Sequence, residues 1–116
     1  MRIGEAAKRA AVSTSLIRFY EEKGVLPEPR RTAAGYRDYT PDDIDLIRFA
    51  KRTQSVGFSL AEVREIVALR TESRPPCSTV RQSMTDKVAA IETQIGELRE
   101  LQVDLDRLQT LATGTE

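Results

Sequence analysis

The chain has 116 residues, of which 40% are hydrophobic and 31% are charged, and its formal net charge at pH 7 is zero. This length allows one compact domain with an appendage and excludes two full-sized domains. No apolar run approaches the roughly 18 residues of a membrane span and no signal peptide opens the chain, so we expect a soluble cytoplasmic protein.

The first 24 residues predict two short helices. The apolar stripe of the first helix recurs at helical spacing and consists of Ile3, Ala6, Ala7 and Ala10. Ser13 is placed to cap the second helix and Gly24 to end it. The inward side of this second helix carries Leu16, Ile17 and Tyr20. Two short helices joined by residues 10–12 have the proportions of a helix-turn-helix.

The pattern changes after the second helix. Two prolines within residues 25–29 exclude helix there. Residues 30–32 and 36–39 favour two short strands because of their alternation and aromatic content, and residues 33–35 favour the turn between them. We therefore expect a small β-hairpin, or wing, after the helix-turn-helix.

Two further helices follow the hairpin. Thr40 is placed to cap the first of them, with Pro41 at its first position, acidic residues in its first turn and Gly57 at its end. The motif Ser59-x-x-Glu62 is a capping box that starts the next helix, which ends at the proline-containing residues 73–76. The residues expected at helical spacing are Ile44, Ile47, Ala50 and Lys51 in the first helix, and Val63, Ile66, Val67 and Leu69 in the second.

The last segment predicts a helix over residues 80–111, roughly 48 Å long at about 1.5 Å per residue. Its apolar seam follows a heptad pattern with one dropped residue, and consists of Met84, Val88, Ile91, Ile95, Leu98, Leu101, Leu105, Leu108 and Ala112. The head, residues 1–70, is too small to cover this seam, and each exposed Leu or Ile forgoes about 1.5–3 kcal/mol of burial. A second copy of the chain is the expected partner, and a helix folded back on its own head is the alternative.

The charged residues are unevenly distributed. Residues 1–37 contain eight Lys and Arg against four Asp and Glu, whereas residues 38–116 contain ten against fourteen. Chance clustering in a short window would give similar counts, so the positions of the arginines are more informative than their number. Arg18 lies on the second helix away from its apolar side, and the hairpin adds Arg30, Arg31 and Arg37.

A helix suited to the major groove beside a basic, aromatic wing predicts a nucleic-acid interface, because guanidinium groups are natural partners of phosphate. Tyr20 and Tyr36 add hydroxyl groups that can donate to phosphate, whereas Phe19 and Tyr39 are expected in the core. An enzyme is not expected: the chain has no histidine for a Ser–His or Cys–His pair, and no phosphate-cradling glycine loop.

Four blocks of the sequence resemble the MerR family of bacterial transcription regulators. They are Ile3-Gly4-Glu5-x-Ala7, Ile17-Arg18-Phe19-Tyr20-Glu21-x-x-Gly24, Gly35-Tyr36-Arg37-x-Tyr39 and Val56-Gly57-Phe58-Ser59-Leu60-x-Glu62-Val63. The resemblance covers the whole chain, because the family also has the terminal coiled-coil helix. It implies a mostly α fold with a winged helix-turn-helix head on each subunit and an antiparallel coiled coil that joins two subunits.

The expected organisation is a DNA-binding domain over residues 1–70, a hinge over 71–79, a dimerisation helix over 80–112 and a tail over 113–116. The resemblance also implies a mechanism: the dimer binds a promoter whose spacer is too long for RNA polymerase, and an activating signal makes it bend and untwist that spacer. Carried over by position, groove or backbone contacts are implied for Thr14, Ser15 and Arg18, wing contacts for Arg31, Tyr36 and Arg37, and a phosphate anchor for Tyr20.

The sequence departs from the family at two places. Members usually carry Gly where this chain has Ala11, and a left-handed conformation there would cost Ala roughly 1 kcal/mol. Metal-sensing branches place one cysteine at the start of the long helix and more in a loop after it. Cys77 matches the first, but residues 111–116 contain neither Cys nor His.

Cys77 therefore leaves three interpretations open. A soft-metal site commonly needs three or four thiolate or imidazole ligands, so a metal ion bound at Cys77 would need carboxylates or the second thiol of a dimer. A thiol switch is a second interpretation, and a packing residue at the hinge is a third.

Two other functions share parts of these features. A winged-helix repressor or DNA-architectural protein would have the same head without inducible untwisting. A coiled-coil interaction module would have the long helix and no role on DNA.

Overall fold

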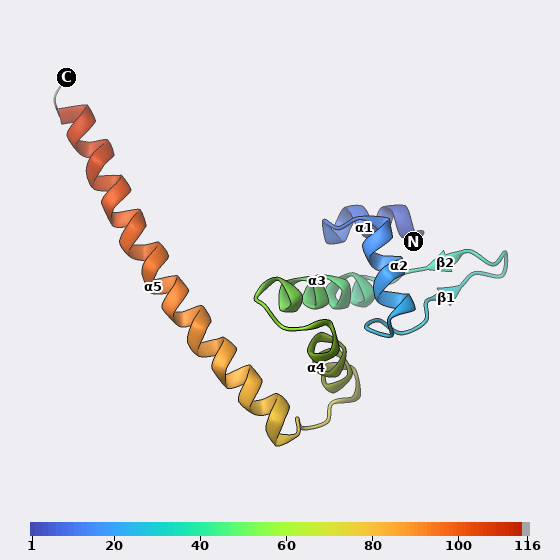
Figure 1. Cartoon of the computed structure of the whole chain (residues 1–116). Coiled ribbons are helices and arrows are strands. Elements are labelled where there is room, and N and C mark those ends of the chain that lie inside the picture. Colours follow the sequence, from blue (N-terminus) through green and yellow to red (C-terminus); the bar gives the residue numbers. More distant parts are fainter. Residues whose placement is uncertain (115–116) are drawn as a thin grey trace. The chain divides into compact units, whose positions relative to one another are not determined.

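The order of elements along the chain follows the order that the sequence predicts. The computed structural model describes residues 1–114, and side chains through Leu111. The elements are α1 (Ile3–Ala10), α2 (Thr14–Glu22), β1 (Arg30–Arg31), β2 (Arg37–Asp38), α3 (Pro41–Ser55), α4 (Leu60–Glu72) and α5 (Ser78–Gly114). They are mostly helical, with one small hairpin and one long C-terminal helix (Figure 1). The expected fold class is confirmed for the single chain.

The chain divides into two compact units, Met1–Val80 and Arg81–Glu116. The core of the first unit lies among α1, α2, α3 and α4, and its fully buried side chains include those of Ile17, Tyr20, Ile47 and Val63. The predicted inward residues of α1 to α4 are buried or partly buried, with one exception, since Lys51 is exposed. Tyr39 is buried as expected, but Phe19 keeps 37% of its surface exposed, so its expected place in the core was wrong.

Three helices of the first unit begin at side-chain caps. Before α2, Ser13 Oγ accepts a hydrogen bond from the Leu16 amide at 3.0 Å. Before α3 and α4, a capping hydroxyl and a carboxylate three residues later exchange hydrogen bonds with each other's backbone, and the capping residues are Thr40 and Ser59. Side chains here satisfy amide groups that the helix leaves without partners, which is why short polar motifs predicted these starts correctly.

The turn between α1 and α2 contains a residue in the left-handed region. Ala11 has φ 58° and ψ 43°, and it follows the last residue of α1. The Ala11 and Val12 amides donate to the Lys8 and Ala7 carbonyls, at 3.2 and 3.0 Å respectively. This is a Schellman motif, which ordinarily has glycine at the left-handed position. Alanine therefore carries strain there that glycine would not.

Replacing Ala11 by glycine is expected to raise the free energy of unfolding by about 1 kcal/mol, because the left-handed strain is removed. The matched control is Ala61→Gly, at an exposed position in the first turn of α4, which should not raise stability, because Ala61 has no left-handed strain for glycine to remove. Urea unfolding at one protein concentration measures both changes. A loss of stability in Ala11→Gly would show that the strain is absent.

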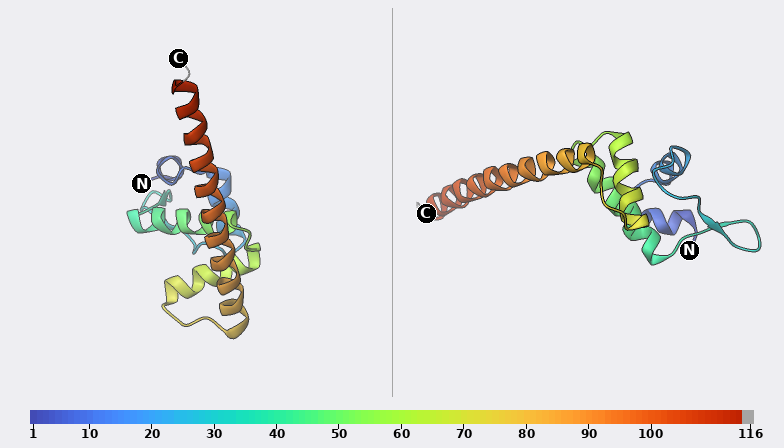
Figure 2. Two further views of the ribbon diagram at one scale, coloured as in Figure 1. Left: turned by 90° about the vertical axis from the view of Figure 1, so that its left-hand side faces the viewer. Right: turned by 90° about the horizontal axis from the view of Figure 1, so that it is seen from below.

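The wing is a two-stranded antiparallel hairpin that projects beyond the helices of the first unit (Figure 2, right). Arg30 pairs with Asp38 and Arg31 pairs with Arg37. The Gly35 amide donates to the Thr32 carbonyl at 2.9 Å, and Gly35 has φ 86°. Glycine suits this turn because a side chain would strain such a backbone conformation.

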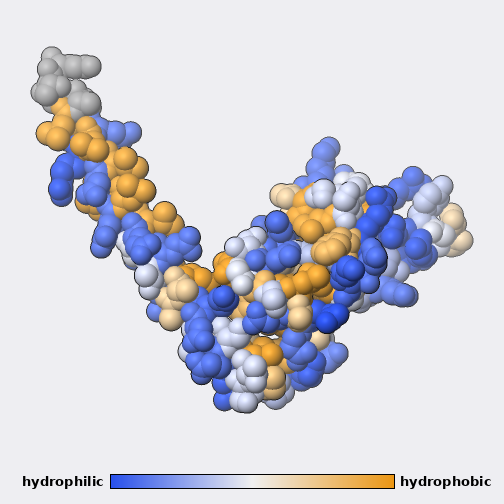
Figure 3. All heavy atoms as spheres, in the orientation of Figure 1, coloured by the Kyte–Doolittle hydropathy of each residue, from blue (hydrophilic) through white to orange (hydrophobic). Residues whose placement is uncertain are grey.

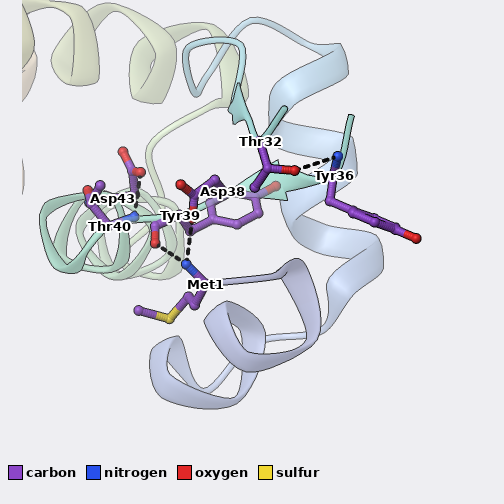
Figure 4. A network of polar contacts seen from close by, with 7 residues as sticks. All are labelled: Met1, Thr32, Tyr36, Asp38, Tyr39, Thr40 and Asp43. Atoms are coloured by element: carbon purple, nitrogen blue, oxygen red, sulfur yellow. Dashed lines mark hydrogen bonds and ion pairs between the residues drawn. The ribbon is translucent and has the colours of Figure 1, made fainter. Parts of the chain in front are cut away.

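The base of the wing is joined to the start of the chain. The Met1 ammonium group donates to Asp38 Oδ1 at 2.8 Å and to the Tyr39 carbonyl at 2.7 Å (Figure 4). The Tyr39 amide donates back to the Met1 carbonyl at 2.7 Å. Nearer the tip, the Tyr36 amide donates to Thr32 Oγ1 at 3.2 Å. These bonds hold the first residues against strand β2 and so bring Arg2 to the wing.

Helix α5 is the predicted long helix, with its start two residues before the expected position. Hydrophobic residues, coloured orange, follow one another along this helix in Figure 3. Leu98, Leu101, Leu105 and Leu108 are each 51–60% exposed. Val103 and Leu111, outside the predicted seam, are exposed as well, and the side chain of Ala112 lies outside the described residues. Within residues 1–114, no helix is both long enough and apolar enough to cross a membrane.

Candidate DNA interface

Four arginine side chains meet at one shallow surface pocket of the first unit. The pocket has a volume of about 220 Å³ and lies where α1, α2 and the wing come together. Its lining residues are Arg2, Ile3, Arg18, Arg31, Gly35, Tyr36 and Arg37. Four guanidinium groups around one opening create a positive potential that favours an anion. The pocket therefore has the chemistry of a phosphate site.

Local contacts orient two of these arginines. The Arg2 guanidinium carbon lies 3.9 Å from the centre of the Tyr36 ring, a cation–π contact. The Tyr36 side chain is 51% exposed, and Figure 4 shows it directed away from Tyr39. Arg31 Nη1 donates to the Gly35 carbonyl at 2.9 Å, across the tip of the hairpin. Among the ion pairs of the described residues, none involves Arg2, Arg18 or Arg31.

The start of α2 adds hydroxyl groups on the side of Arg18. Thr14 and Ser15 occupy the first turn of α2, and Arg18 follows them by four and three residues, so all three share one helix face. Ser15 and Arg18 are exposed and Thr14 is partly exposed. The first turn of α2 holds no acidic residue, which leaves the positive end of the helix dipole without a carboxylate.

Arg37 differs from the other arginines because it faces a buried carboxylate. Arg37 Nε lies 3.3 Å from Oε1 of Glu21, whose side chain is only 8% exposed. The Tyr39 hydroxyl donates to the other oxygen, Oε2, at 2.7 Å. Burial, and then the hydrogen bond to Glu21, raises the pKa of the Tyr39 hydroxyl far above its ordinary value, so it stays protonated as the donor.

Tyr20 lies away from this surface. Its side chain is fully buried, and its hydroxyl donates to Gln54 Oε1 on α3. Burial raises the pKa of this hydroxyl. A hydroxyl in the core does not reach phosphate, so we leave Tyr20 out of the contact set that we propose below.

Two residues of the site, Arg2 and Glu21, were not predicted from the sequence. Arg2 precedes the first helix, and only its contact with Tyr36 reveals its place. The motif Arg18-Phe19-Tyr20-Glu21 contained Glu21, but nothing in its spacing indicated that this carboxylate is buried. Both belong to the site through contacts with the wing, which is distant from them in the sequence.

Cys77 lies just before α5 and is exposed. In the part of the chain that the structure describes, no group of three or more His, Cys, Asp or Glu side chains is placed to hold a metal ion. Within the described residues of one chain, Cys77 therefore lacks the neighbouring ligands that a complete soft-metal site needs.

Comparison with known proteins agrees with the geometry. The family model described as "MerR HTH family regulatory protein" matches residues 1–69, and the one described as "MerR, DNA binding" matches residues 44–108. The chain is 35% identical over 116 residues to the HTH-type transcriptional regulator HmrR of Rhizobium leguminosarum bv. viciae, covering 100% of this chain and 89% of the relative.

Two solved structures have a similar fold. The transcription regulator PbrR691 from Ralstonia metallidurans CH34, in complex with lead(II), has a TM-score of 0.65 and 33% identity, covering 94% of this chain and 84% of that one. HiNmlR, a MerR family regulator bound to promoter DNA, has a TM-score of 0.71 at 21% identity, covering 86% and 76%, and shows the fold alone. On the matching family models and relatives, this chain belongs to the MerR family, whose members are DNA-binding transcription regulators and not enzymes.

Proposed function

We propose that this protein acts in the cytoplasm as a homodimer on a promoter with a long spacer, and activates transcription by bending and untwisting that spacer when an effector binds. The observation that carries the proposal is the pocket lined by four arginines between α2 and the wing. It supports a DNA backbone contact beside a helix that enters the major groove. The contact set that we propose is Arg2, Thr14, Ser15, Arg18, Arg31, Tyr36 and Arg37.

The exposed apolar face of α5 supports the dimer. Its leucines are more than half exposed, and an unpaired helix with such a face would lose substantial burial energy in water. Pairing of two α5 helices in an antiparallel coiled coil would bury it and hold two heads on one duplex. Each head would then bind one end of the DNA site. Bending a site of 20–30 base pairs costs on the order of 1–6 kcal/mol, which many phosphate contacts can offset.

The experiment is transcription by purified RNA polymerase from the promoter upstream of the protein's own gene. We expect a spacer longer than ordinary, little transcription without effector, and activation when the right effector is added. Shortening the spacer to ordinary length should give transcription without the protein, because polymerase then meets both promoter elements in phase. A promoter of ordinary spacing that the protein only represses would overturn the untwisting mechanism.

The same transcription assay can identify the effector. Soft metal ions and thiol-reactive electrophiles are added in turn to the protein and to Cys77→Ser. An effector that needs the thiol should lose its effect in Cys77→Ser, while DNA binding without effector stays unchanged. Equal activation of both proteins would exclude Cys77 from sensing.

A further inference from the structure

The carboxylate of Glu21 links the two parts of the DNA interface. Glu21 lies in the last turn of α2, three residues after Arg18, and so on the same side of the helix. Its two oxygens face residues from the segment that leads from the wing into α3: Arg37 in β2 and Tyr39 just after it. Glu21 thus connects the helix proposed for the groove with the wing proposed for the backbone.

Burial makes this carboxylate dependent on its partners. The Glu21 side chain is only 8% exposed, and a carboxylate in such a place needs charge or hydrogen-bond partners, because leaving water is costly. Oε2 has the Tyr39 hydroxyl. Neither Oε1 nor Arg37 Nε has a hydrogen-bond partner within the described residues, and the two atoms lie 3.3 Å apart. The Glu21 carboxylate and the Arg37 guanidinium group therefore compensate each other's charge.

This pair determines which side of the Arg37 guanidinium group faces the pocket. The Nε edge faces Glu21, and Arg37 also lines the pocket together with Arg2, Arg18 and Arg31. Like charges repel, so three guanidinium groups around the same opening push Arg37 outward when no anion is present. The carboxylate behind it opposes that repulsion and leaves the terminal amino groups to bind an anion.

We propose that Glu21 is a positioning residue for DNA binding: its carboxylate holds Arg37 in the orientation that contacts a backbone phosphate. The proposal rests on the proposed function, since Arg37 must contact DNA for its orientation to count. Glu21 does not touch the DNA. It acts through Arg37, and Tyr39 holds the carboxylate from the other side.

Glu21→Gln tests the proposal, because glutamine keeps the shape and can still accept from Tyr39, but removes the charge that faces Arg37. Two effects then have opposite signs. Loss of positioning weakens DNA binding, whereas loss of a negative charge near DNA strengthens it. We expect positioning to dominate, with an affinity for the operator about tenfold lower, which is less than the loss of two charge-assisted hydrogen bonds per dimer because Arg37 itself is still present in both heads. Tighter binding by Glu21→Gln would make the carboxylate a mere counter-charge and overturn the proposal.

The matched control is Glu22→Gln, which removes the same charge from the neighbouring, exposed position of α2 and should leave affinity within about twofold. Tyr39→Phe keeps the carboxylate charged but removes the hydrogen bond to Oε2, and we expect it to weaken binding by about threefold. Thermal unfolding of each variant, followed by circular dichroism, verifies that the head is folded at the temperature of the binding assay.

A double-mutant cycle separates positioning from a general loss of structure. In the Arg37→Ala background, Glu21→Gln should no longer weaken binding, because the residue that it positions is gone. Additive losses would show that Glu21 acts on the fold and not through Arg37. If Arg37→Ala alone leaves affinity and salt dependence unchanged, the proposed contact of Arg37 fails. If Arg37→Ala weakens binding and Glu21→Gln does not, only the positioning role fails.

Discussion

Replacing Leu101 and Leu105 by glutamate is expected to convert the proposed dimer to a monomer and to lower operator affinity by at least a hundredfold. The two side chains are 52% and 51% exposed in the single chain and lie on the predicted seam of α5. Burying each leucine in a dimer contributes about 1.5–3 kcal/mol, and each glutamate in the same place adds an unpaired charge that must leave water. Two such changes per chain are four per dimer, so the dimer would lose about 6–12 kcal/mol of leucine burial.

The loss of affinity follows from the loss of linkage between the two heads. In a dimer, binding of the first head raises the local concentration of the second to about the millimolar range, and this contributes roughly 10²–10⁴-fold to affinity. A monomeric head retains its own phosphate contacts but loses that factor. Sedimentation velocity measures the oligomeric state, and fluorescence anisotropy with labelled operator measures affinity.

The control places two glutamates on the other side of the same helix. Thr93 and Thr110 are exposed and lie two residues from the nearest seam positions, so Thr93→Glu with Thr110→Glu adds the same charge away from the seam. This variant should remain dimeric and bind the operator within a few-fold of the parent. A dimeric Leu101→Glu, Leu105→Glu variant would place the dimer contact elsewhere on the chain.

The second large effect is expected from the arginines of the pocket. Arg18→Ala should weaken operator binding by at least tenfold, since one charge-assisted hydrogen bond is worth about 1.5–3 kcal/mol and the dimer loses two copies. Arg18 is exposed, so its removal should leave stability nearly unchanged. Arg37→Ala should weaken binding as strongly, and it should also lower stability, because it leaves the buried Glu21 carboxylate facing no cation.

Salt dependence identifies which of these arginines contact phosphate. Each phosphate contact contributes about 0.9 to the slope of log affinity against log salt concentration, so a substitution present in both heads should lower the slope by about 1.8. The matched control is Arg99→Ala, which removes the same charge from the exposed surface of α5 and should leave the slope unchanged. If a variant has the same slope and the same affinity as the parent protein, the arginine that was replaced does not contact DNA.

Local patterns determined the elements of this protein. Helix starts were correctly predicted at Ser13, Thr40 and Ser59, because a cap is a hydrogen bond between residues three positions apart and is visible in the sequence. The long helix and its apolar seam were predicted because periodicity is a property of consecutive residues. The cost of alanine at position 11 was indicated by the family resemblance, since members usually carry glycine there, and the backbone of Ala11 is left-handed with φ 58°.

Tertiary packing decided which side chains form the site. Phe19 was expected in the core but is exposed. Tyr20 is buried, as its place on the inward side of α2 predicted, but its hydroxyl donates to Gln54, 34 residues away, and so cannot serve as the phosphate anchor that the resemblance implied. The carboxylate of Glu21 meets Tyr39, 18 residues away, and Arg2 stacks on Tyr36 of the wing. Such contacts depend on how the wing and helices pack in three dimensions, and the hydrogen-bonding and periodic signals in a sequence extend over only a few residues.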